Sequence, residues 1–171
     1  DKAVEILRKK GLATLSKRAE RETSEGVIVS KTSEDKKVAV LAMLCCETDF
    51  VAKSDDFLAA ADTLADYAFA CPAEDGAENL LQTEINGKKY SDLLTELVSR
   101  TGEKTEVGEF AKYKLDGPGL ISTYVHFNQK VATMLKITTS DQSVAESDSI
   151  KQTAADIAMH ITAAKPLALD Q

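Results

Sequence analysis

The nine residues from Val38 to Cys46 form an almost unbroken apolar run, and this run restricts the fold more than any other feature of the chain. Side chains of a β-strand point alternately to opposite faces. A strand that is apolar at every position therefore lies in the middle of a sheet or is covered on both sides. A shorter apolar segment at 26–30 precedes the run, and a polar turn at 33–36 separates them. The two segments together predict an antiparallel hairpin.

A turn and then a helix follow this run. Apolar residues recur at helical spacing over 54–70, and Ser54 or Asp55 can cap the first free amides of such a helix. The stretch from Cys46 to Lys53 therefore connects a buried strand to a helix, and Phe50 lies inside it. Phe50 has two interpretations. It staples the helix start to the core, as single aromatics usually do, or it points outward at a partner.

The other elements of the first half are marked by periodicity and by glycine. Helices are expected over 1–10 and 13–23, with Gly11 as the stop between them, and over 90–100. Apolar and charged residues alternate over 105–115, which predicts an edge strand or a strand with one exposed face.

The second half of the chain repeats the first with an offset of 93 residues. Lys37-Val-Ala-Val-Leu corresponds to Lys130-Val-Ala-Thr-Met, and Leu64-Ala65 corresponds to Ile157-Ala158. The repeat predicts a second unit made of two strands and a helix. These elements are expected over 120–126, 130–137 and 149–164.

Two such units predict an α+β fold, because each would place helices beside a small antiparallel sheet. We expect two pseudo-repeated subdomains preceded by an N-terminal helical segment. The strongest turn signal of the chain, Asp116-Gly117-Pro118-Gly119, falls between the two units. The expected bounds are 1–25 for the helical segment, 26–117 for the first subdomain and 118–171 for the second.

The repeat is incomplete at Phe50. The counterpart of residues 46–53 is Thr139-Ser-Asp-Gln-Ser-Val-Ala-Glu146, which contains no aromatic residue. A side chain needed only for the core of each unit would have a similar partner in the second copy. The difference favours a role for Phe50 that belongs to the first unit alone.

Composition excludes several function classes. The formal net charge is −7, which argues against binding nucleic acid by neutralising its phosphates. No apolar run approaches the roughly 20 residues needed to span a membrane. The three cysteines form no even framework and indicate reduced thiols. No catalytic motif, metal-ligand spacing or phosphate-binding loop is visible, so we expect neither an enzyme nor a cofactor or metal.

The segment Cys46-Glu-Thr-Asp-Phe-Val-Ala-Lys53 resembles the signature of elongation factor Ts, the family of nucleotide-exchange factors for the translational GTPase elongation factor Tu. Tyr124-Val-His-Phe-Asn-Gln-Lys-Val131 resembles an aromatic-x-His hairpin segment of that family. Ala158-Met-His-Ile161, which leads to Pro166, resembles its Ala-Met-His helix end, and Thr101-Gly102-Glu103 resembles its Ile-Gly-Glu turn. The resemblance covers essentially the whole chain.

The resemblance implies an exchange factor that binds elongation factor Tu with GDP and releases the nucleotide without a reaction of its own. Phe50 would be a wedge between helices of the GTPase, and Asp49 would disturb the groups that hold its Mg²⁺ ion. Thr48 and Val51 would set the loop. Additional contacts are implied for Thr101, Gly102 and His126.

The same resemblance implies a place in protein synthesis, in the bacterial cytosol or in an organellar matrix or stroma. The sequence leaves a homodimer open. It departs from the family pattern where two N-terminal helices would precede residues 1–11, and it ends before the coiled-coil insertion or final strand of longer members. Two alternative functions therefore stay open: a ribosome-associated or structural binding module that keeps the fold without exchange, and a small enzyme.

Overall fold

The computed structural model describes residues 2–166, apart from the side chains of residues 3, 4, 7, 8, 14 and 15. Its central feature is an antiparallel sheet of three strands, β1 (Glu25–Thr32), β2 (Val38–Cys46) and β5 (Thr105–Lys114). The strand order is β1-β2-β5, so the apolar run forms the middle strand, as predicted, and β5 lies at an edge. The α+β class is confirmed.

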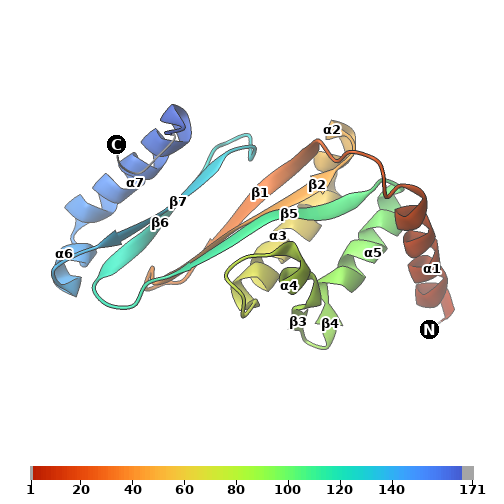
Figure 1. Ribbon diagram of the computed structural model, residues 1–171, viewed down its shortest axis with the longest axis horizontal. Helices are drawn as coiled ribbons and strands as arrows, with labels where there is room; N and C mark the ends of the chain where they lie inside the picture. Colours follow the sequence, from red (N-terminus) through yellow and green to blue (C-terminus); the bar gives the residue numbers. More distant parts are fainter. Residues whose placement is uncertain (1, 167–171) are drawn as a thin grey trace.

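Two helices, α3 (Asp55–Ala70) and α5 (Tyr90–Thr101), cover one face of this sheet (Figure 1). The hydroxyl of Ser54 caps α3 by accepting a hydrogen bond from the Phe57 amide, at 3.4 Å. Alternate residues of β2 point at the helices and form the main core with them. The buried side chains include Val40, Ala42, Leu44, Cys46, Phe57, Leu64 and Leu97.

Helix α1 (Lys2–Lys17) is continuous, so the prediction of two helices separated by Gly11 is wrong. Gly11 is buried against α5, and a Cβ at this position would collide with the carbonyl oxygen of Thr95. Because Gly11 has no side chain, α1 and α5 can approach each other closely at this position, and the glycine does not end α1. The chain leaves the helix at Arg18 and enters β1 without further helical structure.

Short elements connect α3 to α5. They are α4 (Ala77–Gln82), which the sequence did not predict, and the two-residue strands β3 (Glu84–Ile85) and β4 (Lys88–Lys89). The turn between these strands is Asn86-Gly87, and both residues have positive φ, 52° and 77°. Of the helices in residues 2–166, none is long and apolar enough to cross a membrane.

The second unit consists of the hairpin β6 (Gly119–Val125) and β7 (Ala132–Thr138), the short helix α6 (Gln142–Glu146) and α7 (Asp148–Ala164). α7 lies along the hairpin (Figure 1). Ile157 is 40% exposed, whereas Leu64, its counterpart in the repeat, is fully buried. A two-stranded sheet covers only a narrow stripe of the helix, which buries Ala154, Ala158 and Thr162.

The 93-residue repeat extends to the local geometry. α3 begins at Asp55 and α7 at Asp148, and the hydroxyls of Ser54 and Ser147 cap them. A short helix precedes each long one: α2 (Asp49–Ala52) in the first unit and α6 in the second. Within residues 2–166, β5 has no counterpart in the second unit.

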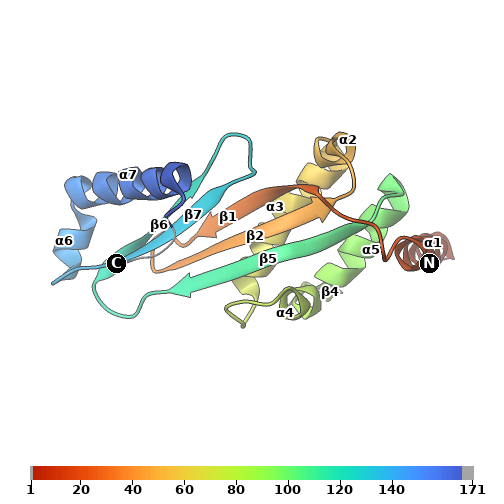
Figure 2. The ribbon, with the colours of Figure 1, turned by 45° about the horizontal axis from the view of Figure 1, so that its top comes forward.

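The β6–β7 hairpin forms its own sheet beside β1 (Figure 2). At one end the Ile28 amide donates to the Gln129 carbonyl, at 2.8 Å, and at the other the Ile121 amide donates to the Lys36 carbonyl, at 2.8 Å. Lys37 Nζ adds three hydrogen bonds across this junction. Its acceptors are the carbonyls of Gly117 and Gly119 and the side-chain oxygen of Gln142.

Candidate functional site

Phe50 projects from the turn after β2. It lies on the single turn of α2, and its side chain is 83% exposed. Ala52 on the same turn is buried, and Val51 packs against the main core. The apolar residues of α2 therefore fasten the turn from inside, while the aromatic ring faces solvent. The interpretation of Phe50 as a core staple is wrong. Phe57, fully buried in α3, is one of the aromatic residues of the core.

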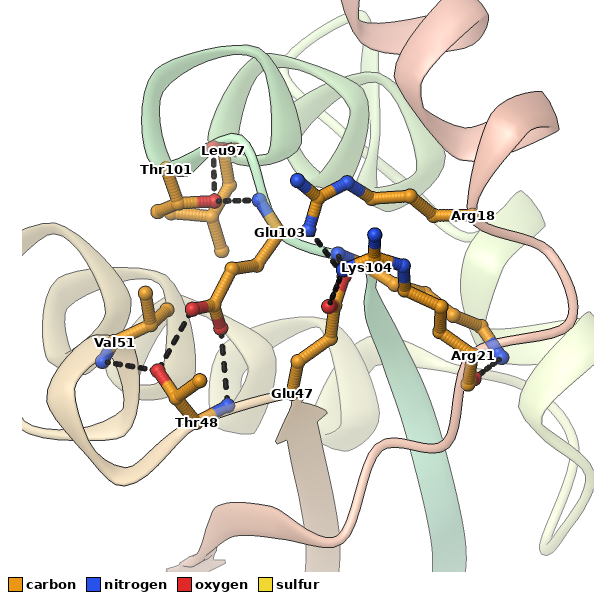
Figure 3. Close-up of polar contacts among 9 residues, drawn as sticks. All are labelled: Arg18, Arg21, Glu47, Thr48, Val51, Leu97, Thr101, Glu103 and Lys104. Atoms are coloured by element: carbon orange, nitrogen blue, oxygen red, sulfur yellow. Dashed lines mark hydrogen bonds and ion pairs between the residues drawn. The ribbon is translucent and has the colours of Figure 1, made fainter.

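Thr48 begins this turn in extended backbone geometry, with φ −126° and ψ 155°. Its Oγ1 caps α2 by accepting a hydrogen bond from the Val51 amide, at 3.3 Å. The carboxylate of Glu103 then holds Thr48 from outside. It accepts a hydrogen bond from the Thr48 amide at 3.1 Å and another from Thr48 Oγ1 at 2.7 Å (Figure 3). The start of the turn is thus fixed on both its backbone and its side chain.

Thr101 and Gly102 determine the position of Glu103 and of its carboxylate. Gly102 ends α5 in the left-handed region, with φ 73°, where a residue without a Cβ is favoured. Thr101 Oγ1 donates to the Leu97 carbonyl at 3.1 Å and accepts from the Glu103 amide at 3.4 Å (Figure 3). The sequence-predicted pair thus lies beside the turn that carries Phe50, and Glu103 links the two.

Glu47 anchors the same turn to the segment after α1. Its Oε1 accepts hydrogen bonds from Arg18 at 2.8 Å and from the Lys104 amide at 2.6 Å, and its Oε2 pairs with Arg21 at 2.8 Å (Figure 3). Burial alone would raise the pKa of Glu47. The hydrogen bonds from Lys104, Arg18 and Arg21 outweigh it and lower this pKa to about 2.

Asp49 is the acidic residue next to the ring. Lys53, one turn later, donates to its Oδ2 at 2.7 Å, and both side chains face solvent. The hydrogen bond and charge of Lys53 lower the pKa of Asp49, so Asp49 is an anion at neutral pH. Water screens an exposed pair of this kind, so Asp49 can exchange Lys53 for another cation at little cost.

His126 belongs to the tip of the β6–β7 hairpin. Its Nδ1 lies 3.0 Å from the hydroxyl of Tyr124, and its ring centroid lies 4.4 Å from that of Phe127. Lys130 of the same tip pairs with Glu25 at 2.5 Å, at the start of β1. The tip therefore lies at the end of the sheet that carries α2, on the same side in Figure 1.

Sequence reasoning assigned no role to Glu47 or Glu103. Glu47 lies inside the signature segment and Glu103 inside the Thr-Gly-Glu turn, so both belong to motifs that are visible in the sequence. Their contacts span 29 and 55 positions, to Arg18 and Thr48, and no local pattern indicates which partner such a carboxylate will find.

Comparison with known proteins identifies the family of this chain. The family model described as Elongation factor TS matches residues 47–171 of the chain. The chain belongs to the elongation factor Ts family. It is 40% identical to elongation factor Ts of Alkalilimnicola ehrlichii over 166 residues, which cover 97% of this chain and 53% of that protein.

Other elongation factor Ts proteins match along the whole chain. That of Chlorobium phaeobacteroides is 37% identical over 99% of this chain and 58% of its own length, and that of Clostridium botulinum strain Eklund 17B is 35% identical over 100% and 55%. The chain spans about half the length of the curated relatives it matches. The resemblance to the elongation factor Ts family is confirmed, and the turn with Phe50, Glu103 and the hairpin tip all fall inside the matched region.

Proposed function

We propose that this elongation factor Ts family chain binds elongation factor Tu with GDP and promotes GDP release in protein synthesis, with Phe50 as a wedge. The observation that carries the proposal is the exposure of Phe50 on a turn fixed by Thr48, Glu103 and the buried Ala52. A large aromatic ring left in water gains free energy on entering an apolar site of a partner, and such rings dominate interface energetics.

The rigidity of the turn matters as much as the exposure of the ring. The hydrogen bonds to Thr48 are present in the free chain, so little conformational entropy is lost when Phe50 enters its partner. A ring on a mobile loop would adapt to the GTPase. A ring on a fixed turn forces the GTPase to adapt, and that is the requirement for a wedge.

Exchange by this route needs no chemical reaction of the chain. The chain must bind nucleotide-free elongation factor Tu more tightly than the GDP-bound form, and by linkage GDP then weakens its binding by the same factor. Asp49 increases this difference in affinity. Carried in beside the ring, its carboxylate competes for the groups that hold Mg²⁺, which weakens the metal and with it the phosphates of GDP.

The remaining predicted contacts frame this wedge. Thr48 and Val51 hold the turn, and Thr101 and Gly102 lie beside it through Glu103. His126 lies on the hairpin tip at the same end of the sheet. The homodimer that the sequence leaves open and a place in the cytosol or an organelle stay untested.

Release of a fluorescent GDP analogue from elongation factor Tu, followed by stopped flow, tests the proposal. Phe50→Ala is expected to reduce the acceleration of release about tenfold or more, the loss typical of a hot-spot aromatic. Its unfolding free energy should stay within about 0.5 kcal/mol of the unmodified chain, because the ring makes little use of the core.

Two matched aromatic variants complete the design. Tyr113→Ala removes a 41% exposed ring at the opposite end of the sheet and should leave GDP release unchanged. Phe57→Ala removes the buried ring and should lower stability by about 3–5 kcal/mol. Normal acceleration by the Phe50 variant would remove Phe50 from the mechanism. No acceleration by the unmodified chain would overturn the exchange function, and capture of ribosomes without elongation factor Tu would then support the binding-module alternative.

A further inference from the structure

Phe127 is the second aromatic ring that the fold leaves in water. It is 88% exposed and Phe50 is 83% exposed, and these are the two most exposed large apolar side chains among those that the structure describes. Single exposed apolar residues are common on proteins and need no explanation. Two exposed rings that lie at the same end of a sheet, each on a rigid support, do need an explanation.

The hairpin tip that carries Phe127 is ordered by its own hydrogen bonds. The His126 amide donates to the Val131 carbonyl at 3.0 Å, and the Gln129 amide donates to the His126 carbonyl at 2.8 Å. The His126 ring lies against Phe127 at 4.4 Å and is itself positioned by the Tyr124 hydroxyl. Phe127 is therefore presented on a fixed support, as Phe50 is.

The tip is also fixed relative to the turn with Phe50. The Gln129 carbonyl accepts a hydrogen bond from the Ile28 amide at 2.8 Å, and Lys130 pairs with Glu25 at 2.5 Å. Glu25 is the register partner of Cys46, the last residue of β2 before the turn. The Lys130–Glu25 pair thus joins the hairpin tip to the end of β1 that lies beside the turn with Phe50.

This arrangement has the make-up of a protein-binding surface, with aromatic anchors and polar groups around them. Resting on the proposed function, we propose that Phe127 is a second aromatic anchor for the same GTPase, elongation factor Tu, and that it fixes the orientation in which Phe50 enters. The resemblance implies a contact for His126 and assigns none to Phe127. The turn with Phe50 and the hairpin tip lie at the same end of the sheet. This argues for one partner, because a protein that receives Phe50 at this end can also reach the hairpin tip.

An anchor and a wedge have different kinetic signatures. Phe127→Ala is expected to raise the chain concentration that gives half-maximal GDP release about tenfold, and to leave the rate at saturation within about twofold. Phe50→Ala should lower the rate at saturation instead. Phe127→Leu keeps an apolar side chain and should recover most of the affinity. Tyr113→Ala, at the other end of the sheet, is the control and should change neither quantity.

A photo-crosslinking benzoylphenylalanine at position 127 gives a second readout that does not depend on exchange. We expect it to form a covalent product with nucleotide-free elongation factor Tu, and the same group at position 113 to form none. Half-maximal concentrations unchanged by Phe127→Ala, or crosslinks from position 127 only to a second copy of this chain, would overturn the role of Phe127. If the unmodified chain releases no GDP, the exchange function fails by itself, and the crosslink from position 127 still decides whether Phe127 touches the GTPase.

Discussion

The carboxylate of Glu103 accepts two hydrogen bonds from Thr48, one from its amide at 3.1 Å and one from its Oγ1 at 2.7 Å. The two residues are 55 positions apart, at the end of α5 and at the start of α2. Through this contact a helix on the covered face of the sheet determines where the turn with Phe50 begins. Glu103 is therefore a positioning residue for Phe50, because it acts on the turn through its contacts with Thr48.

Glu103→Ala is expected to loosen the turn. Loss of two hydrogen bonds to a carboxylate should cost about 1–3 kcal/mol of stability and leave the Thr48 amide without its partner. Hydrogen exchange at Thr48 and Val51 should accelerate, and GDP release from elongation factor Tu should slow. Glu103→Gln keeps one acceptor oxygen, so its stability and its rate of hydrogen exchange at Thr48 should lie between those of the unmodified chain and of Glu103→Ala. Glu109→Gln, an exposed change on β5, is the control. Unchanged exchange protection at Thr48 in the alanine variant would contradict a positioning role.

Glu47 makes the stability of the chain depend on pH in the acid range. Its pKa is lowered from 4.5 to about 2 in the folded chain, so the unfolded chain binds the proton more readily. The contribution of Glu47 is therefore complete above about pH 4.5 and is lost as the pH falls from about 4.5 to about 2. Chemical denaturation of the unmodified chain and of Glu47→Gln should show a stability difference that is constant at neutral pH and shrinks through this window. A difference that persists undiminished at pH 2 would contradict the assignment.

Gly11→Ala sets helix propensity against packing. In an exposed helix interior this change stabilises by about 1 kcal/mol, because glycine loses more backbone entropy than alanine. Here the new Cβ meets the carbonyl oxygen of Thr95, a backbone atom that cannot move without α5. We expect net destabilisation of about 1–3 kcal/mol, measured by thermal or chemical denaturation. Ala13→Gly, at an exposed position of α1, provides the matched comparison, and a stabilising Gly11→Ala would show that α1 does not pack closely on α5.

Local patterns accounted for the elements and for their order. The apolar run from Val38 to Cys46 predicted the middle strand, and periodicity over 54–70 predicted α3 within a residue of its observed start. The offset of 93 residues predicted the second hairpin and α7. These signals are local because strand alternation, helical spacing and caps act between residues a few positions apart.

The sequence by itself determined that Phe50 lies at a strand-to-helix turn and that the counterpart of this turn in the second unit, residues 139–146, contains no aromatic residue. Only the tertiary structure decided that Phe50 faces solvent, that Glu103 and Glu47 hold its turn, and that Phe127 shares its end of the sheet. It also decided that Gly11 lies inside a helix, because that depends on how closely α5 passes. Each of these facts depends on segments far apart in the chain meeting in space, and the free energy of such contacts is set by packing that no local pattern records.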